Sequence, residues 1–278
     1  MSEGQVESPT RGSEEWLVGI FGLPSEVRVS QKIPKKTLME MGAGGRGGKK
    51  LVQELIRELR WVASLQPSNT GLPGAKGEPD STNEIEVIWG RVRSEPSRSS
   101  MLLDLTIQIH RSIPYPIVLA MTSDAGWVEF SIAIPAVIES SLTNRPPQER
   151  PLVVRLDEGR LTQSAIEHEG SPFRMGQLPR ISVADLYVAW FDRLLSLAIS
   201  QRTGVFGVSN SNHETRTRFE ALRRSTDLEI EISALTSKAN KAKQIRIRSD
   251  LNLELRQKTS ELMECQSLLV GSASARME

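Results

Sequence analysis

The sequence predicts an α+β protein: a small, mostly antiparallel sheet with packed helices, followed by a C-terminal helical hairpin or coiled-coil tail. Two apolar runs, residues 117–121 and 127–133, flank a short segment of Thr, Ser, Asp, Ala and Gly, which favours a strand pair. Residues 182–201 have the spacing of a long helix that Ser182 can cap. Residues 214–269 contain neither Gly nor Pro, as expected of uninterrupted helix.

These signals divide the 278 residues into three parts. Residues 1–15 are polar and acidic, and we expect a disordered leader because they have little to bury. Residues 16–203 form the predicted α+β domain, and residues 214–269 form the predicted helical tail. A chain of this length can hold one substantial core and an appendage.

Within the first half of the domain, Pro34 precedes a predicted short helix at residues 35–41. Residues 42–48 are rich in glycine and are interpreted as a connector. Apolar residues then recur at helical spacing, which predicts a helix over residues 49–62.

The second half continues with a Pro- and Gly-rich loop at residues 66–83 and an alternating strand at residues 85–92. Residues 99–111 satisfy both the strand and the helix period. A Pro-rich loop at residues 144–151 precedes a short predicted strand at residues 152–156.

The tail carries two apolar stripes with 4-3 spacing, each on one side of a helix. Leu251, at the start of the second stripe, lies nine positions after Ala242, at the end of the first, or about two and a half turns at roughly 3.6 residues per turn. The second stripe therefore faces away from the first unless the helix breaks between them. We predict that the stripes bind a protein partner, and keep self-association as an alternative. The predicted partner-binding residues are Leu228, Ile232, Leu235, Leu251, Leu255, Leu262 and Leu269.

Composition excludes several classes of protein. The net charge of +1 gives no global attraction to nucleic acid, and Cys265 is the only cysteine, so no internal disulfide can form. No apolar run is long enough to span a membrane, and the acidic start is unlike a signal peptide. The three histidines are far apart in sequence; we predict no metal site and no cofactor.

Two basic stretches could bind DNA phosphates, residues 28–60 and residues 238–248. The alternative is a solvated face, or pairing with nearby glutamates, and the near-zero net charge favours that alternative. The candidate DNA-binding residues are Lys32, Lys35, Lys36, Lys49, Lys50, Lys241, Lys243, Arg246 and Arg248. The glutamates available to pair in the tail are Glu229, Glu231, Glu254 and Glu261.

Catalytic motifs are weak, and the sequence favours a non-catalytic role with no catalytic residue assigned. The glycine run has Ala43 and Lys50 where a phosphate-binding loop needs Gly and a hydroxyl. A metal-dependent nuclease using Glu84 or Glu86 is the alternative, although neither is followed by Lys two positions on. That alternative would need Glu84 or Glu86 to converge with further acids in a pocket. The candidates for these further acids are Asp104, Asp124 and Glu129.

Six segments, in this order, carry a resemblance to a known family. They are Phe21–Pro24, Val29–Lys36, Leu59–Trp61 with Leu65 and Pro67, Ile113–Ile117, Leu186–Tyr187, and Lys243–Asn252 with Leu255. The chain thereby resembles the bacterial domain-of-unknown-function family 4391 over about residues 20–268. It departs at Val188, where members usually have Glu, and in the glycine-rich insert.

The resemblance implies a context as well as a fold. It favours the helical interpretation of residues 99–111, and it implies a cytoplasmic protein. Family members are often encoded beside helicase and DNA methyltransferase genes in restriction-like, phage-defence neighbourhoods. We therefore expect a non-catalytic accessory subunit of such a complex, with a helicase or a DNA methyltransferase as its partner. The family offers no catalytic residue to carry over.

Overall fold

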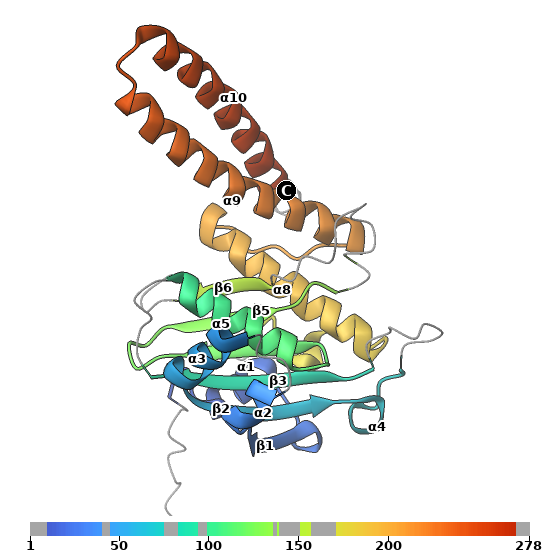
Figure 1. Cartoon of the computed structure of the whole chain (residues 1–278). Coiled ribbons are helices and arrows are strands. Elements are labelled where there is room, and N and C mark those ends of the chain that lie inside the picture. The colour runs from blue at the N-terminus through green and yellow to red at the C-terminus, as the bar shows by residue number, and fades with distance from the viewer. Residues whose placement is uncertain are drawn as a thin grey trace, which may run out of the picture. The chain divides into compact units, whose positions relative to one another are not determined.

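The computed structural model describes residues 10–40, 45–74, 83–93, 99–135, 138, 151–156 and 171–270. The chain divides into two compact units. The first comprises Met1–Ala136 and Leu142–Leu194, and the second comprises Val137–Ser141 and Leu195–Glu278. The predicted mixture of helices with a mostly antiparallel sheet is confirmed (Figure 1).

A six-stranded sheet forms the centre of the first unit, with its strands side by side in chain order. The strands are β1 (Arg28–Lys32), β2 (Ile56–Leu65), β3 (Ile85–Val92), β4 (Ile117–Thr122), β5 (Val128–Ile132) and β6 (Leu152–Leu156). Neighbours are antiparallel except β3 and β4, which are parallel. A parallel pair needs a long crossover, and helix α5 (Ser99–Ser112) lies in that connection.

One face of the sheet is covered by α2 (Lys35–Glu40), α3 (Gly45–Leu55) and α5 (Figure 1). Leu38, Val52 and Leu105 on these helices are almost fully buried and belong to one apolar cluster with sheet residues such as Ile88 and Met121. Burial of these side chains stabilises the layer by roughly 1.5–3 kcal/mol each.

The opposite face is closed by α1 (Glu14–Phe21) and the first half of α8 (Val183–Thr203). Phe21 lies at the centre of an aromatic cluster, with ring centroids 6.0 Å from Phe130, 5.8 Å from Phe173 and 5.3 Å from Trp190. The Trp190 ring meets Phe21 edge-on, a favoured geometry for aromatic pairs. Short helical turns complete the unit at η1 (Ser25–Val27), α4 (Pro67–Thr70) and η2 (Met175–Gln177).

The prediction of one helix over residues 49–62 is wrong. Helix α3 begins earlier, at Gly45, and ends at Leu55, and residues 56–65 form strand β2. The glycine-rich connector predicted for residues 42–48 is therefore helical from Gly45 onward. Two bulges interrupt the β2–β3 register and space buried residues three apart, which imitates a helical stripe.

The end of the predicted leader also needs correction, because residues 10–15 are part of the described structure. Ser13 caps α1 by accepting a hydrogen bond from the Trp16 backbone N–H at 3.1 Å, and Glu14 and Glu15 occupy the first turn. Gly12 is buried with a φ of 76°, a conformation that favours glycine. The earlier leader residues, 1–9, lie outside the described part.

The second unit contains a helical hairpin of α9 (Asn212–Lys241) and α10 (Ile245–Val270), which run back along each other (Figure 1). Only residues 242–244 separate the two helices, so the break that reconciles the two apolar stripes is present. Leu228, Leu235 and Leu269 are buried. Ile232, Leu251, Leu255 and Leu262 are half-buried.

Several other predicted elements are confirmed. The short helix after Pro34, the helix over residues 99–111 and the long helix after Ser182 are α2, α5 and α8. The strands at 85–92, 117–121, 127–133 and 152–156 are β3 to β6. Residues 75–82 and 144–150, parts of two predicted loops, lie outside the described residues. Within the described part, no helix has the length and apolarity needed to cross a membrane.

Candidate functional sites

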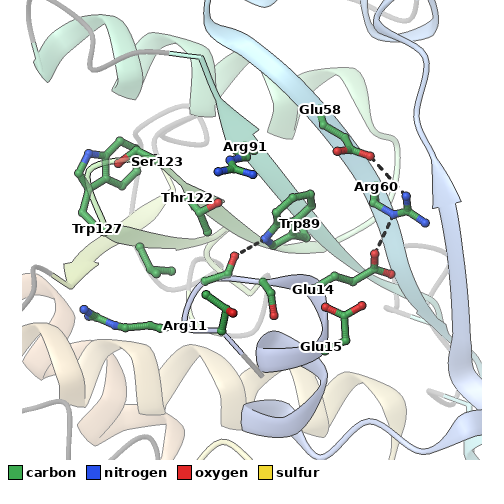
Figure 2. A pocket seen from close by; sticks show the side chains of 15 residues that line it. Arg11, Glu14, Glu15, Glu58, Arg60, Trp89, Arg91, Thr122, Ser123 and Trp127 are labelled. Atoms are coloured by element: carbon green, nitrogen blue, oxygen red, sulfur yellow. Dashed lines mark hydrogen bonds and ion pairs between the residues drawn. The ribbon is translucent and has the colours of Figure 1, made fainter. Parts of the chain in front are cut away.

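A charged pocket of about 430 Å³ lies on the α1 side of the sheet (Figure 2). Its floor carries Glu58 and Arg60 from β2 and Trp89 and Arg91 from β3, and Glu14 of α1 lies on its rim. The Glu58–Arg91 and Arg60–Trp89 pairs lie opposite each other across the two strands, so all four side chains share one face.

Arg60 is held from three directions within this pocket. Its Nε lies 2.7 Å from Glu14 Oε2, and its Nη1 lies 3.3 Å from Glu58 Oε1. Its Nη2 donates to the Ser30 carbonyl oxygen at 2.9 Å. Figure 2 shows the guanidinium between the two carboxylates. This arrangement joins α1, β1 and β2. It also neutralises the positive charge of Arg60, which an anionic ligand would need.

Arg91 and Trp89 are also committed to the protein itself. Arg91 Nε donates to Asp124 Oδ1 at 2.8 Å, and Arg57 lies 3.4 Å from the other Asp124 oxygen. The indole N–H of Trp89 donates to the Gly12 carbonyl oxygen at 2.7 Å. The polar groups of the pocket therefore pair with each other and hold the N-terminal segment against the sheet.

The acids of the nuclease alternative lie elsewhere on the sheet. Glu84 and Glu86 flank the start of β3, where Ser64 donates to Glu86 at 3.0 Å and Gln66 donates to Glu84 at 2.6 Å. Burial, reinforced by the nearby Glu84, raises the pKa of Glu86 to about 8 against the opposing Ser64 hydrogen bond. A carboxyl group with this pKa is largely neutral at pH 7.

Glu129 and His110 form a second buried polar strip, between β5 and α5. Burial raises the pKa of Glu129 to about 7, although Arg155 and Thr106 oppose the shift. His110 Nε2 lies 3.0 Å from Ser131 Oγ, and burial lowers the pKa of this imidazole to about 3. His110 is therefore neutral at physiological pH, as in a structural hydrogen bond.

The remaining acids do not join these groups. Asp104 is exposed on α5, and Asp124 in the β4–β5 turn pairs with arginines. Among the described residues, no three His, Cys, Asp or Glu side chains are placed to hold a metal ion. The geometry on which the nuclease alternative depends is absent from this part of the chain.

The N-terminal basic stretch is partly used within the fold. Lys35 donates to the Ile56 carbonyl oxygen, and burial, followed by the nearby Arg93 and Lys32, lowers its pKa. Lys36 lies 3.7 Å from Glu40, and Lys50 lies 3.8 Å from Glu54, each one helical turn away. Lys32 and Lys49 are exposed.

The hairpin tip, defined here as residues 238–248, is different. Of the four glutamates considered as its partners, Glu254 is exposed and the other three are engaged away from the tip. Arg224 Nε lies 2.6 Å from Glu261, Lys258 lies 2.8 Å from Glu231, and Arg202 lies 2.9 Å from Glu229. Within the described part of the chain, the tip cations are exposed and have no ion-pair partner. They are Lys238, Lys241, Lys243, Arg246 and Arg248.

The hairpin presents a second feature on its outside. The predicted partner-binding leucines lie along its buried and half-buried stripes, whereas other large apolar residues are exposed. On α10 these are Leu253, Met263 and Leu268, with 59%, 63% and 51% of their surface accessible. At about 100° per residue, these three residues project about 160°, 120° and 100° away from Leu251 on the inner stripe. They therefore share the outer half of α10, with polar residues such as Ser260 and Glu264 between them.

Sequence reasoning did not find the charged pocket, because its residues come from four strands and an N-terminal segment assigned to the leader. The alternation of Glu58 with Arg60 and of Trp89 with Arg91 was the available signal. It becomes informative only when residues 56–65 are recognised as a strand paired with β3.

The fold thus defines a class: a mixed α/β domain with a C-terminal helical hairpin, whose outer face and tip are the exposed features. The chain belongs to the family described as Domain of unknown function (DUF4391), which matches it over residues 21–262. The resemblance expected from the sequence motifs is therefore confirmed. No curated protein and no solved structure matches the chain.

Proposed function

We propose that this protein is a non-catalytic accessory subunit of a bacterial restriction-like or phage-defence complex. It acts with a helicase, a DNA methyltransferase or both, and docks them through its C-terminal helices. The observation that carries the proposal is a set of three large apolar residues on the outer half of α10, Leu253, Met263 and Leu268, which remain exposed after the inner stripe has packed in the hairpin.

Exposed apolar residues grouped on one part of a surface are a sign of an interaction site. The inner side of α10 includes Leu255, Leu262 and Leu269. The outer side includes Leu253, Met263 and Leu268, and Ile230 of α9 is 65% exposed as well. Leaving such residues in water forgoes roughly 1.5–3 kcal/mol for each one that a partner could bury.

The hairpin is built to present this surface in a fixed form. Arg224 pairs with Glu261 and Lys258 pairs with Glu231 across the two helices, and Arg224 also pairs with Glu231 within α9. These ion pairs are half-buried near the surface, so their value lies in register more than in energy. A preorganised surface loses little conformational entropy on binding, which favours a specific partner.

The identity of the partner rests on the family. The resemblance implies genes for helicases and DNA methyltransferases nearby, and these enzymes are the partners that we propose. The nuclease alternative gains no support from the described acids, which do not converge in the charged pocket.

Capture of the tagged full-length chain from its native host tests this proposal. The wild-type protein should recover a helicase or a DNA methyltransferase. A Leu253→Asp/Leu268→Asp variant should lose at least about tenfold of that recovery, because the new charges must be desolvated in the interface.

The matched control is Leu253→Met/Leu268→Met, which changes the same positions but keeps them apolar and should retain the partner. Capture of neither enzyme by the wild-type protein would refute the proposal. Undiminished capture by the aspartate variant would refute docking through this surface.

A further inference from the structure

We infer that the hairpin tip, residues 238–248, binds the phosphate backbone of duplex DNA without sequence preference. This inference does not rest on the proposed docking, because it uses different residues at the turn of the hairpin. It is carried by the positive charge of the tip, by its exposure, and by the unfavourable residues at the start of α10.

The hairpin concentrates cations that are dispersed along the sequence. No acidic residue occurs between Glu231 and Asp250. Lys238 and Lys241 end α9, and Arg246 and Arg248 begin α10, with Lys243 in the turn between them. The turn brings both groups to one end of the hairpin. The nearest acid in the sequence is Asp250 of α10, and Glu229, Glu231 and Glu261 are engaged elsewhere.

The start of α10 violates the usual rules of helix stability. The N-terminus of a helix carries a partial positive charge and favours acidic residues, yet the first turn of α10 has none and carries arginines instead. Ile245 and Ile247 are also 80% and 47% exposed. Local features that cost stability without compensation within the fold are characteristic of binding sites.

A phosphate backbone supplies what this surface lacks. Each phosphate can accept from a Lys or Arg and complement the positive end of α10. Exposed Ser237, Asn240, Gln244 and Ser249 add neutral donors of the kind that contact phosphates. No aromatic residue follows Phe219, so the tip has no platform for stacking the bases of single strands.

An anionic membrane shares the phosphate chemistry but fits less well. Ile245 and Ile247 are two residues apart, so they project about 200° from each other on a helix. They do not form the continuous apolar face with which amphipathic helices enter a bilayer. Duplex nucleic acid requires no such face.

The test measures binding of the full-length chain to a fluorescent random-sequence duplex of about 20 base pairs across a salt series. The tip variant combines Lys241→Ala, Lys243→Ala, Arg246→Ala and Arg248→Ala. We expect it to bind about 100-fold more weakly at low salt. The slope of log affinity against log salt should fall by about 3.6, at about 0.9 per lost phosphate contact.

The matched control combines Lys32→Ala, Lys36→Ala, Lys49→Ala and Lys50→Ala, which removes the same charge from the other basic stretch. It should bind the duplex nearly as tightly as the wild-type chain. An equal loss in both variants would mean that affinity follows net charge, and would overturn the assignment to the tip.

A second variant guards against misfolding. Arg246→Glu/Arg248→Glu should lose duplex binding while its Tm stays equal or rises, because acids suit the start of α10. The inference is overturned if the wild-type chain does not bind the duplex. It is also overturned if single strands bind more tightly, or if the chain binds only vesicles of phosphatidylcholine and phosphatidylserine.

Discussion

Burial controls the protonation of Glu86, a carboxyl group on the central strand β3. Only 4% of this residue is exposed, and its pKa is raised to about 8. In the unfolded chain the same group ionises near pH 4.3. The folded state therefore holds a proton that the unfolded state releases, and this proton stabilises the fold below pH 4.3. The stabilisation is lost as the pH rises toward 8.

We expect Glu86→Gln to raise the Tm at pH 8 by a few degrees and to leave it nearly unchanged at pH 4. The amide resembles the protonated acid and can still accept from Ser64, but it cannot ionise. Thermal unfolding from pH 4 to 9 measures the effect. Glu129, whose pKa is raised to about 7, should preserve part of the dependence of Tm on pH in this variant.

The exposed Glu220→Gln on α9 is the matched control, and its pH profile should follow that of the wild-type chain. A Glu86→Gln profile parallel to the wild-type profile at all pH values would show that Glu86 is ionised in the folded protein.

The sequence shows which residues carry charge but not which charges are paired. Arg224 reaches Glu261, 37 positions along the chain, so this pair depends on the hairpin turn. The near-zero net charge favoured paired or solvated cations, and at Lys36 and Lys50 pairing is found. The hairpin tip differs already in sequence, because residues 232–249 contain no acid, whereas Lys36 and Lys50 each have a Glu four positions on.

At the scale of elements, the clearest failure of sequence reasoning is strand β2. Ile56, Leu59 and Val62 are fully buried at intervals of three, because bulges shift the strand pairing. Strand β1 escaped notice for another reason, since every residue in it is exposed and no apolar alternation marks it. Both failures arise from pairing between distant segments, which no local window contains.

The sequence predicts the two helices of the hairpin but does not mark the turn between them. The 4-3 stripes identified both helices, but residues 242–244 read Ala-Lys-Gln and contain no Gly or Pro to mark the turn. The change of phase between the stripes was the remaining signal. Tertiary packing stabilises the hairpin over one continuous helix, because a break lets the two stripes face each other.

We expect Leu228→Ala to lower the free energy of unfolding by about 2–5 kcal/mol, because it removes a side chain with no exposed surface. Leu253→Ala makes the same chemical change on the exposed side of α10 and should stay within about 0.5 kcal/mol. Urea unfolding of both variants provides the comparison. Equal losses would mean that Leu253 is as buried as Leu228.

At the scale of the whole molecule, the fold class and the order of elements followed from periodicity and turn residues. The charged pocket did not, because Glu14, Arg60 and Arg91 meet only when three segments come together. The exposed outer side of α10 and the exposed hairpin tip are likewise defined only by the tertiary structure. Burial of the inner stripes separates the apolar residues that build the hairpin from those that stay exposed on α10.

Because the stripes of α9 and α10 pack against each other within one chain, the hairpin needs no second copy of the protein. The mass of the purified chain in solution, measured by light scattering during size-exclusion chromatography, tests this most directly. We expect 30.9 kDa, the mass of one chain. A stable species of about twice that mass, dispersed by Leu253→Asp/Leu268→Asp, would show that the outer face of α10 pairs with itself and would contradict docking of a different protein there.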